Sequence, residues 1–398
     1  MLKRNKSKHV GQGCFFALML LACNSQLAVS QSTSRPVQSS TAQPVQPFQS
    51  AQQPAVQQPA AQQPAVQPQA TQTPSGNLVP VQKPAMDDKP KEFDAEASYE
   101  FLKTICEIGP RISTTEGMMK QQKILKKHFE DLNATVEMQN FRATHPLARN
   151  TTTQLQNMIV SWHPDRPKRL MLCCHYDTRP FPDQDRKNPR GVFIGANDGG
   201  SGVALLMEMG KHMEQLPGKY GIDFVFFDAE EFVYDMRVDP MFVGSTYFAR
   251  QYAAGQFQRR SFYKAPEPKI EYGILVDMVG DKHLEIGMEG NSLKQGARGQ
   301  GGPGRLTQSI WGVANDLKVK EFKNKQLHLI RDDHLPLNDI ARIPTCDIID
   351  FDYPKPNKNV IGGTYWHTTR DTVENCSADS LGKVGKVLLE WIRRLEKL

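Results

Sequence analysis

The sequence has few cysteines and little sustained apolar character, and both shortages exclude classes of protein. Seven cysteines among 398 residues are too few for a disulfide-stapled scaffold. Apolar residues make up 39% of the chain and charged residues 23%, which is the composition of a globular protein diluted by a polar segment. A multi-span membrane protein is therefore excluded.

Several binding signatures are missing as well. No G-x-G-x-x-G follows a predicted strand, and the sequence contains neither a P-loop nor a G-x-S-x-G elbow. The 49 basic and 43 acidic residues, net charge +6, are interleaved, without a Lys/Arg stripe that alternates with aromatic residues. Nucleotide binding and serine hydrolase chemistry are not first choices, and we expect no nucleic acid partner.

The N-terminus is typical of an export signal, which we expect within residues 1–30. A basic stretch of Lys3, Arg4, Lys6, Lys8 and His9 precedes the apolar run Phe15–Ala22, which is too short to span a bilayer stably. Residues 20–23 resemble a bacterial lipobox, which would place a lipid on Cys23, whereas residues 28–30 resemble an ordinary cleavage site. An uncleaved anchor is a third possibility. Each predicts an exported protein that is periplasmic, extracellular or anchored to the envelope.

Residues 31–91 are a Gln/Pro-rich segment of low complexity. Gln-Gln-Pro-Ala recurs with a period of five residues from Gln52, Gln57 and Gln62. The segment has too few large apolar residues to form a core, and dense proline favours extended chain. We interpret it as a disordered spacer, which would hold the following domain away from a membrane or envelope to which the N-terminus is tethered.

Residues 92–398 alternate helical and strand-like patterns and are predicted to form one α/β domain with a mostly parallel sheet. Helical spacing predicts helices over 95–108, 116–132, 203–213, 307–317 and 380–398. Alternation and short apolar runs predict strands over 135–141, 157–162, 169–174, 223–227 and 273–278.

Acidic residues and histidines follow several of these apolar runs. Because the carboxyl ends of parallel strands share one edge of a sheet, we expect these side chains to converge. They include His175, Asp177, Asp198, Glu230, Glu231, Asp277, Asp332 and His367. Oxygen and nitrogen ligands without thiolate suit zinc or a similar divalent ion. Of two adjacent glutamates, one can bind the metal while the other acts as a base.

The ordered motifs His175-x-Asp177, Asn197-Asp198-Gly199, Glu230-Glu231, Asp277-Met278 and Trp366-His367-Thr368 resemble the zinc exopeptidase family of aminopeptidases. Within it, they resemble most the branch of glutaminyl-peptide cyclotransferases, the glutaminyl cyclases. The resemblance implies an aminopeptidase-like three-layer sandwich with a mixed, mostly parallel sheet flanked by helices. It also implies an enzyme, expected as a monomer, that converts N-terminal glutamine of peptides or proteins to pyroglutamate and releases ammonia.

The resemblance also implies roles for individual residues. One zinc is expected on Asp198, Glu231 and His367, with Glu230 as general acid and base. Asp277 and Asp332 are expected to share a hydrogen-bond network with Glu230, and Trp366 to line the substrate pocket.

A two-zinc aminopeptidase is the main alternative, because it uses the same residues. His175 and Asp277 would then hold a second metal that Asp198 bridges, and Asp177 would orient a ligand from outside the coordination sphere. Two features favour the cyclase: Asp332-Asp333-His334, where aminopeptidases usually carry Ser-Asp, and Trp366. A catalytically silent envelope-binding domain is a third hypothesis.

The sequence departs from the animal cyclases near the expected pocket. No tryptophan follows the Glu230-Glu231 pair closely, so Tyr234 or Phe242 is a candidate for an aromatic wall. Asp347, or a neighbour, stands where those cyclases have a histidine. The Gly-rich stretch 299–304 is a candidate mobile loop, and Cys106, Cys346 and Cys376 allow for one disulfide.

Overall fold

A computed structural model describes residues 91–294, 302–356 and 362–397. The expected export signal and nearly all of the expected spacer lie outside the described residues. Residues 299–301 of the Gly-rich stretch lie outside them as well.

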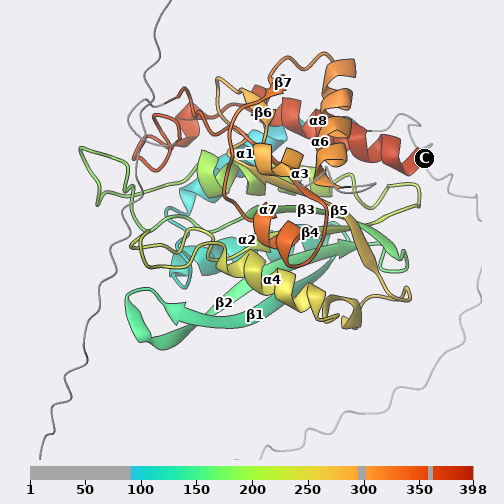
Figure 1. Cartoon of the computed structure of the whole chain (residues 1–398), viewed down its shortest axis with the longest axis horizontal. Helices are drawn as coiled ribbons and strands as arrows, with labels where there is room; N and C mark the ends of the chain where they lie inside the picture. Colours follow the sequence, from blue (N-terminus) through green and yellow to red (C-terminus); the bar gives the residue numbers. More distant parts are fainter. Residues whose placement is uncertain (1–90, 295–301, 357–361, 398) are drawn as a thin grey trace, which may run out of the picture. The chain divides into compact units, whose positions relative to one another are not determined.

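Six strands form a mixed sheet in the order β1-β2-β4-β3-β5-β8 (Figure 1). Strands β4, β3, β5 and β8 run parallel, while the hairpin of β1 and β2 adds antiparallel to β4. Two further short strands, β6 and β7, form a separate parallel pair. The strands are β1 Thr135–His145, β2 Ala148–Trp162, β3 Lys168–His175, β4 Gly221–Phe227, β5 Lys269–Asp277, β6 Ile286–Met288, β7 Phe322–Gln326 and β8 Thr345–Ile349.

Helices cover both faces of this sheet, which makes three layers (Figure 1). On one face, the larger core takes side chains from α1, α2, α3, α6 and α8. On the other face, a smaller core takes Phe248 of α4 and Leu337 of α7. The helices are α1 Ala95–Glu107, α2 Glu116–Asp131, α3 Gly202–Gly210, α4 Val243–Ala253, α5 Gly290–Lys294, α6 Pro303–Asp316, α7 His334–Asp339 and α8 Ala378–Lys397. The predicted fold class is confirmed.

The central strands are mostly apolar because each faces a helical layer on both sides, and the buried charges Arg169 of β3 and Asp223 of β4 pair with each other. In β3, Leu172 and Cys174 enter the larger core, whereas Met171 and Cys173 enter the smaller one. The alternating faces also explain why Cys173 and Cys174 pack separately. All five cysteines of the described part are buried and free, so the disulfide that the sequence allowed is not formed there.

Some boundaries differ from the predictions. Strand β2 begins at Ala148 rather than at residue 157, because its first half is an exposed polar arm of a hairpin with no apolar alternation. Helix α3 ends at Gly210 rather than at residue 213, since glycine is a weak helix former. Helix α4 was not predicted, and its packing against the sheet through Phe248 and Ala249 outweighs a weak local pattern.

The carboxyl ends of the parallel strands meet at one edge of the sheet. His175, the last residue of β3, pairs with Phe227 of β4, and Asp277 of β5 pairs with Ile349 of β8. The residues that follow these ends therefore lie together, and this edge carries the candidate site.

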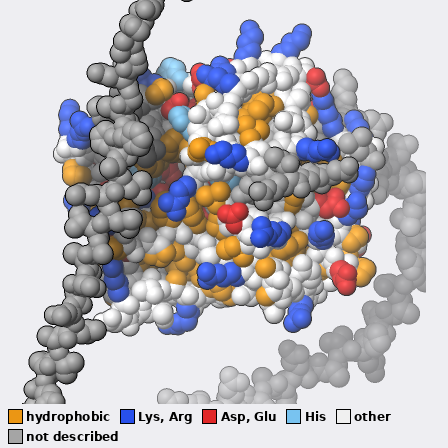
Figure 2. Space-filling view, in the orientation of Figure 1, with side chains coloured by type: hydrophobic (Ala, Val, Ile, Leu, Met, Phe, Trp, Pro, Cys, Tyr) orange, Lys and Arg blue, Asp and Glu red, His pale blue; other side chains and the backbone are white. Residues whose placement is uncertain are grey.

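None of the helices within the described ranges is long and apolar enough to cross a bilayer. On the face drawn in Figure 2, lysine and arginine side chains are dispersed over the surface.

Candidate active site and metal centre

The predicted site residues come from six segments of the chain and are buried together. His175 and Asp277 end β3 and β5, and the Glu230-Glu231 pair lies in the turn after β4. Asp198 lies in the short π-helical turn η1, Asn197–Ser201, that precedes α3. The remaining members, Asp332 and His367, lie in loops before α7 and before the 3-10 turn η4, Val373–Asn375. The structure thus brings together residues separated widely in the sequence, as the strand-end pattern predicted.

Three of these side chains form what we call the first ion pocket. Nε2 of His367 lies 3.3 Å from Oδ2 of Asp198 and 3.2 Å from Oε1 of Glu231. One ligand atom from each residue falls within 4.8 Å of the others. These are the residues expected to hold zinc in a cyclase.

A second ion pocket lies beside the first and shares Asp198. Nε2 of His175 lies 3.3 Å from Oδ1 of Asp198 and 3.2 Å from Oδ1 of Asp277. Asp198 therefore presents one carboxylate oxygen to each pocket, which is the arrangement a bridging ligand requires.

The donor atoms of both pockets fit a zinc ion. Ligands bound tetrahedrally at about 2.0–2.1 Å lie roughly 3.3 Å apart, which matches the observed spacing. Oδ2 of Asp198 is buried and has no hydrogen-bond donor among the described residues. A buried carboxylate oxygen without a donor is costly unless a cation accompanies it. The imidazole and carboxylate donors are also the types that zinc accepts.

Two residues that the sequence analysis missed support the first ion pocket. Nη1 of Arg179 donates to Oε2 of Glu231 at 2.6 Å, and Nη2 donates to Oδ2 of Asp183 at 3.0 Å. Oδ1 of Asp183 in turn lies 3.2 Å from Nδ1 of His367. Arg179 and Asp183 thus link the outer atoms of two ligands into a closed ring. The signal was the spacing Arg-x-x-x-Asp directly after His175-x-Asp177, in a proline-rich loop without periodicity.

Charge sets the ionisation of the first pocket. Burial opposes ionisation of Glu231, but Arg179 and His367 outweigh it and lower the pKa of Glu231 to about 2. Burial and Arg179 both disfavour a proton on His367, yet Glu231, Asp183 and Asp198 raise its pKa to about 10. Without a metal, a protonated imidazole thus supplies the positive charge that a bound cation replaces.

Two aspartates fix the backbone that carries the ligands. Oδ1 and Oδ2 of Asp177 accept the N–H groups of Glu230 and Glu231 at 3.1 and 3.0 Å. Asp371 accepts the N–H groups of Asn197 and Asp198 at 2.7 and 3.0 Å. The sequence predicted a supporting position for Asp177 but gave no sign of Asp371.

Backbone strain is concentrated at the site. Ala229, Met278 and His367 have φ values of 60°, 51° and 52°, in the left-handed region that non-glycine residues rarely adopt. Each is a site residue or directly precedes or follows one. The surrounding structure must hold such conformations, which cost on the order of 1–3 kcal/mol each.

The second pocket is surrounded by further acids. Burial, followed by the charge of Glu231, raises the pKa of Glu230 well above its usual range. Burial also raises the pKa of Asp332, as do the nearby charges of Asp277 and Asp333. The pKa of Asp277 itself is raised by burial, against the influence of His175. These groups therefore favour sharing protons over full ionisation.

These acids open onto a cavity of about 290 Å³ that also reaches the first ion pocket. Trp366 lines it, as expected, and its ring stacks on His367 with 3.7 Å between ring centroids. The other side is apolar, formed by Met236, Met241, Leu329 and Phe351. A small polar group that enters this cavity meets the acids and the ion ligands together.

Two expectations about the pocket wall are wrong. Tyr234 and Phe242 do not line this cavity: Tyr234 packs on Phe181 and Phe232, and Phe242 precedes α4. The wall is Phe351, which packs on Trp366, because β8 leads directly from the sheet edge to this side of the cavity.

Asp347 does not reach the cavity either, since it is fully buried within β8. Its Oδ2 lies 3.6 Å from Nδ1 of His334, whose Nε2 lies 3.3 Å from Oε2 of Glu289. His334 lies two residues after Asp332, so this buried cluster contacts the segment that carries Asp332.

Comparison with known proteins agrees with this geometry. The model of peptidase family M28 matches residues 157–392. The crystal structure of the glutaminyl cyclase of Fimbriiglobus ruber is 37% identical, with a TM-score of 0.67 over 77% of this chain and 97% of that one. The crystal structure of a Zn-dependent exopeptidase from Parabacteroides distasonis is 31% identical, with a TM-score of 0.66 over 77% and 99%.

A curated relative, the glutaminyl-peptide cyclotransferase of Gloydius blomhoffii, is 24% identical over 302 residues, which is 71% of this chain and 76% of the relative. The family model covers most of the folded domain, and the similar structures include both a cyclase and a zinc exopeptidase. The family resemblance predicted from the motifs is confirmed: the chain belongs to peptidase family M28.

Proposed function

We propose that this protein is a zinc-dependent glutaminyl-peptide cyclotransferase, which converts N-terminal glutamine of peptides or proteins to pyroglutamate and releases ammonia. One observation carries the proposal. The second ion pocket is crowded by the carboxyl groups of Glu230 and Asp332 in addition to its own Asp277, while the first pocket beside it is balanced by Arg179. This arrangement favours one metal next to a proton-transfer group.

The side chains present match the proton movements of the reaction. The substrate's α-amine nitrogen attacks its own side-chain carbonyl carbon, the new C–N bond closes a five-membered ring, and the side-chain nitrogen leaves as ammonia. Glu230 takes a proton from the amine and returns one to the leaving nitrogen. Asp277 and Asp332 hold and share protons with Glu230. Asp198, Glu231 and His367 would hold the zinc ion, which would supply a Lewis acid beside the carbonyl of the substrate side chain.

The cavity contributes by orientation. Because nucleophile and electrophile belong to one residue, the protein needs only to hold the glutamine in a bent conformation. Trp366 and Phe351 offer flat apolar surfaces for that side chain, and the half-exposed side chains of Met236 and Leu329 line the cavity as well.

The test uses the purified, zinc-loaded chain and two peptides that differ only in an N-terminal Gln or Leu. We expect mass spectrometry to detect the loss of one ammonia from the Gln peptide and no change in the Leu peptide. Removal of the whole first residue from either peptide would contradict the cyclase.

A two-metal aminopeptidase is the second candidate, and the second ion pocket is the observation that favours it. In that enzyme, His175 and Asp277 would help to hold a second zinc, and Glu230 would activate water. Metal content separates the two functions: we expect one zinc per chain for the cyclase and two for the aminopeptidase.

We propose further that residues 1–30 direct export, that 31–91 form a spacer and that 92–398 are the catalytic domain. The basic and apolar pattern of the first 30 residues supports export, and the Gln-Gln-Pro-Ala repeats support the spacer. The mass of the mature N-terminus tests this, since a lipid on Cys23 and cleavage after Ser30 give different masses. The substitution Cys23→Ala abolishes only the lipidated form.

A further inference from the structure

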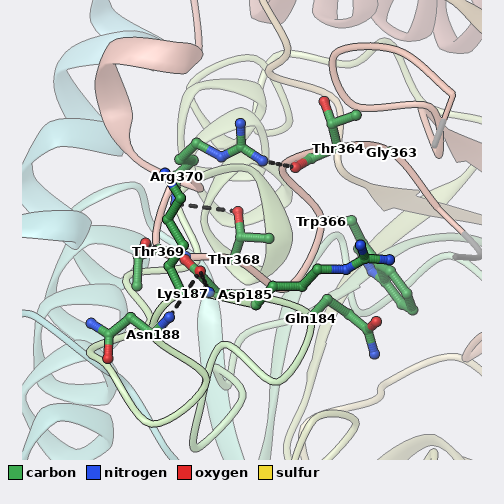
Figure 3. A pocket seen from close by; sticks show the side chains of 11 residues that line it. Gln184, Asp185, Lys187, Asn188, Gly363, Thr364, Trp366, Thr368, Thr369 and Arg370 are labelled. Atoms are coloured by element: carbon green, nitrogen blue, oxygen red, sulfur yellow. Dashed lines mark hydrogen bonds between the residues drawn. The ribbon is translucent and has the colours of Figure 1, made fainter. Parts of the chain in front are cut away.

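A second cavity, of about 470 Å³, adjoins the candidate active site behind Trp366 (Figure 3). Trp366 lines both cavities, so the indole is a shared wall between them. Apart from Trp366, no residue that lines the second cavity has a role in the proposed reaction.

Two loops build this cavity, and both also support the first ion pocket. Gln184–Asn188 directly follow Asp183, and Thr368–Arg370 directly follow His367. The loops are joined where the N–H of Gln184 donates to the carbonyl of His367 at 3.1 Å. The cavity is therefore held in a fixed position relative to the metal ligands.

The charge of the lining is unbalanced. Arg186, Lys187 and Arg370 contribute three cations, and Asp185 is the carboxylate among the lining residues. Asp185 is already occupied by the N–H groups of Lys187, Asn188 and Thr369 and by the hydroxyl of Thr369, several of which Figure 3 shows.

The cations themselves are differently placed. Arg370 donates to the carbonyl of Thr364 and lies over the ring of Tyr365, at 4.4 Å from its centroid. Arg186 and Lys187 are exposed, and neither has an ion-pair partner within the described part of the chain. Two charged groups are thus free to meet a ligand of opposite charge.

We propose that this cavity is a subsite for acidic side chains at about the third to fifth positions of the peptide substrate. The proposal rests on the proposed function, which places the first residue in the neighbouring cavity. An extended peptide advances ~3.4 Å per residue, so its third to fifth residues lie ~7–14 Å from the first, far enough to pass Trp366. Carboxylates that arrive there meet Arg186 and Lys187.

The experiment compares three hexapeptides with the zinc-loaded full chain: Gln-Ala-Ala-Glu-Glu-Ala, Gln-Ala-Ala-Ala-Ala-Ala and Gln-Ala-Ala-Lys-Lys-Ala. Exposed ion pairs contribute factors of a few each, so we expect kcat/KM for the acidic peptide to exceed that for the neutral one by about five- to tenfold, mainly through KM. The advantage should shrink in 0.5 M NaCl, because salt screens exposed charges.

Two double variants localise the effect. Arg186→Ala with Lys187→Ala should bring the ratio of acidic to neutral kcat/KM close to one. Lys318→Ala with Lys320→Ala removes the same charge from residues that line neither cavity and should leave the ratio unchanged. Equal rates for acidic and basic peptides, or a preference that survives in the first double variant, would overturn the subsite.

The test also separates this proposal from the proposed function. If no peptide releases ammonia, the cyclase is wrong, and the subsite is then measured by calorimetric binding of the acidic hexapeptide to the full chain. Binding that the Arg186 and Lys187 double variant weakens supports the subsite, and unaffected or absent binding overturns it.

Discussion

The two ion pockets share Asp198 and have nearly the same ligand spacing, yet their surroundings differ. Around the first, the guanidinium of Arg179 contacts Glu231, and Asp183 contacts His367. Around the second, the neighbours of His175 and Asp277 are further carboxyl groups, chiefly Glu230 and Asp332. The guanidinium of Arg179 offsets the negative charge of the first pocket, whereas in the second pocket protons must relieve the repulsion between the carboxyl groups.

This difference shows why ligand geometry alone does not fix the number of metals. Both pockets fit an ion by distance, but within the described residues only in the first does a guanidinium, that of Arg179, contact one of the ligands before the metal binds. The second keeps acids with raised pKa values, which are suited to move protons. The residues that surround the ligands, rather than the ligands themselves, therefore distinguish the two pockets.

We expect the largest effect from a substitution of Glu230, the proposed proton-transfer group. Glu230→Gln keeps the shape of the side chain but cannot carry the proton, so we expect kcat for cyclisation to fall by about 10²–10⁴-fold. Zinc content, measured by atomic absorption, should be unchanged because Glu230 is outside the first pocket. Glu214→Gln, an exposed residue, is the matched control. Near-normal turnover in Glu230→Gln would show that another group carries the proton.

The next test compares a ligand from each pocket. His367→Asn removes a ligand of the first pocket and should lower zinc affinity by at least about 100-fold, since ligand loss exceeds the effect of losing a supporting residue. His175→Asn should retain one zinc per chain. If instead each variant loses one of two bound ions, both pockets hold metal and the contrast between them disappears.

A substitution of Asp183, which supports the first ion pocket, should have a smaller effect on zinc affinity. Asp183→Asn keeps a polar group beside His367 but removes the charge, and we expect zinc affinity to fall by about 10–100-fold in chelator competition. Asp131→Asn, on the exposed side of α2, is the control. Unchanged affinity in Asp183→Asn would assign Asp183 to loop structure alone.

The smallest effect that we expect is the change in apparent zinc affinity for each pH unit. The pKa of His367 is raised to about 10, so at neutral pH the metal-free ring carries a proton that zinc must displace. Apparent zinc affinity should therefore rise by up to about tenfold per pH unit between pH 6 and pH 8. A flat profile would show that His367 is already neutral in the metal-free protein.

The sequence predicted most of the residues that form the site, but it did not predict most of the residues that hold them in place. Apolar runs that end in polar residues located His175, Glu230, Glu231 and Asp277, because strand ends in a parallel sheet have only one edge to share. Arg179 and Asp371 escaped notice because they act through partners far away in the sequence, and no local period marks such pairs. The aromatic wall was misassigned for the same reason, since Phe351 reaches the cavity only through the position of β8.

The hydrogen bonds from Asn197 and Asp198 to Asp371 have a consequence for when activity appears. The first of these bonds joins residues 174 positions apart, and His367 belongs to the same late segment. Contacts between residues so far apart in the sequence form slowly, so we expect these bonds to form after the sheet between the two segments is in place. A chain still emerging during synthesis therefore holds Asp198 and Glu231 without their third ligand. Catalytic competence arrives with the last segment to dock, so activity reports on completed folding.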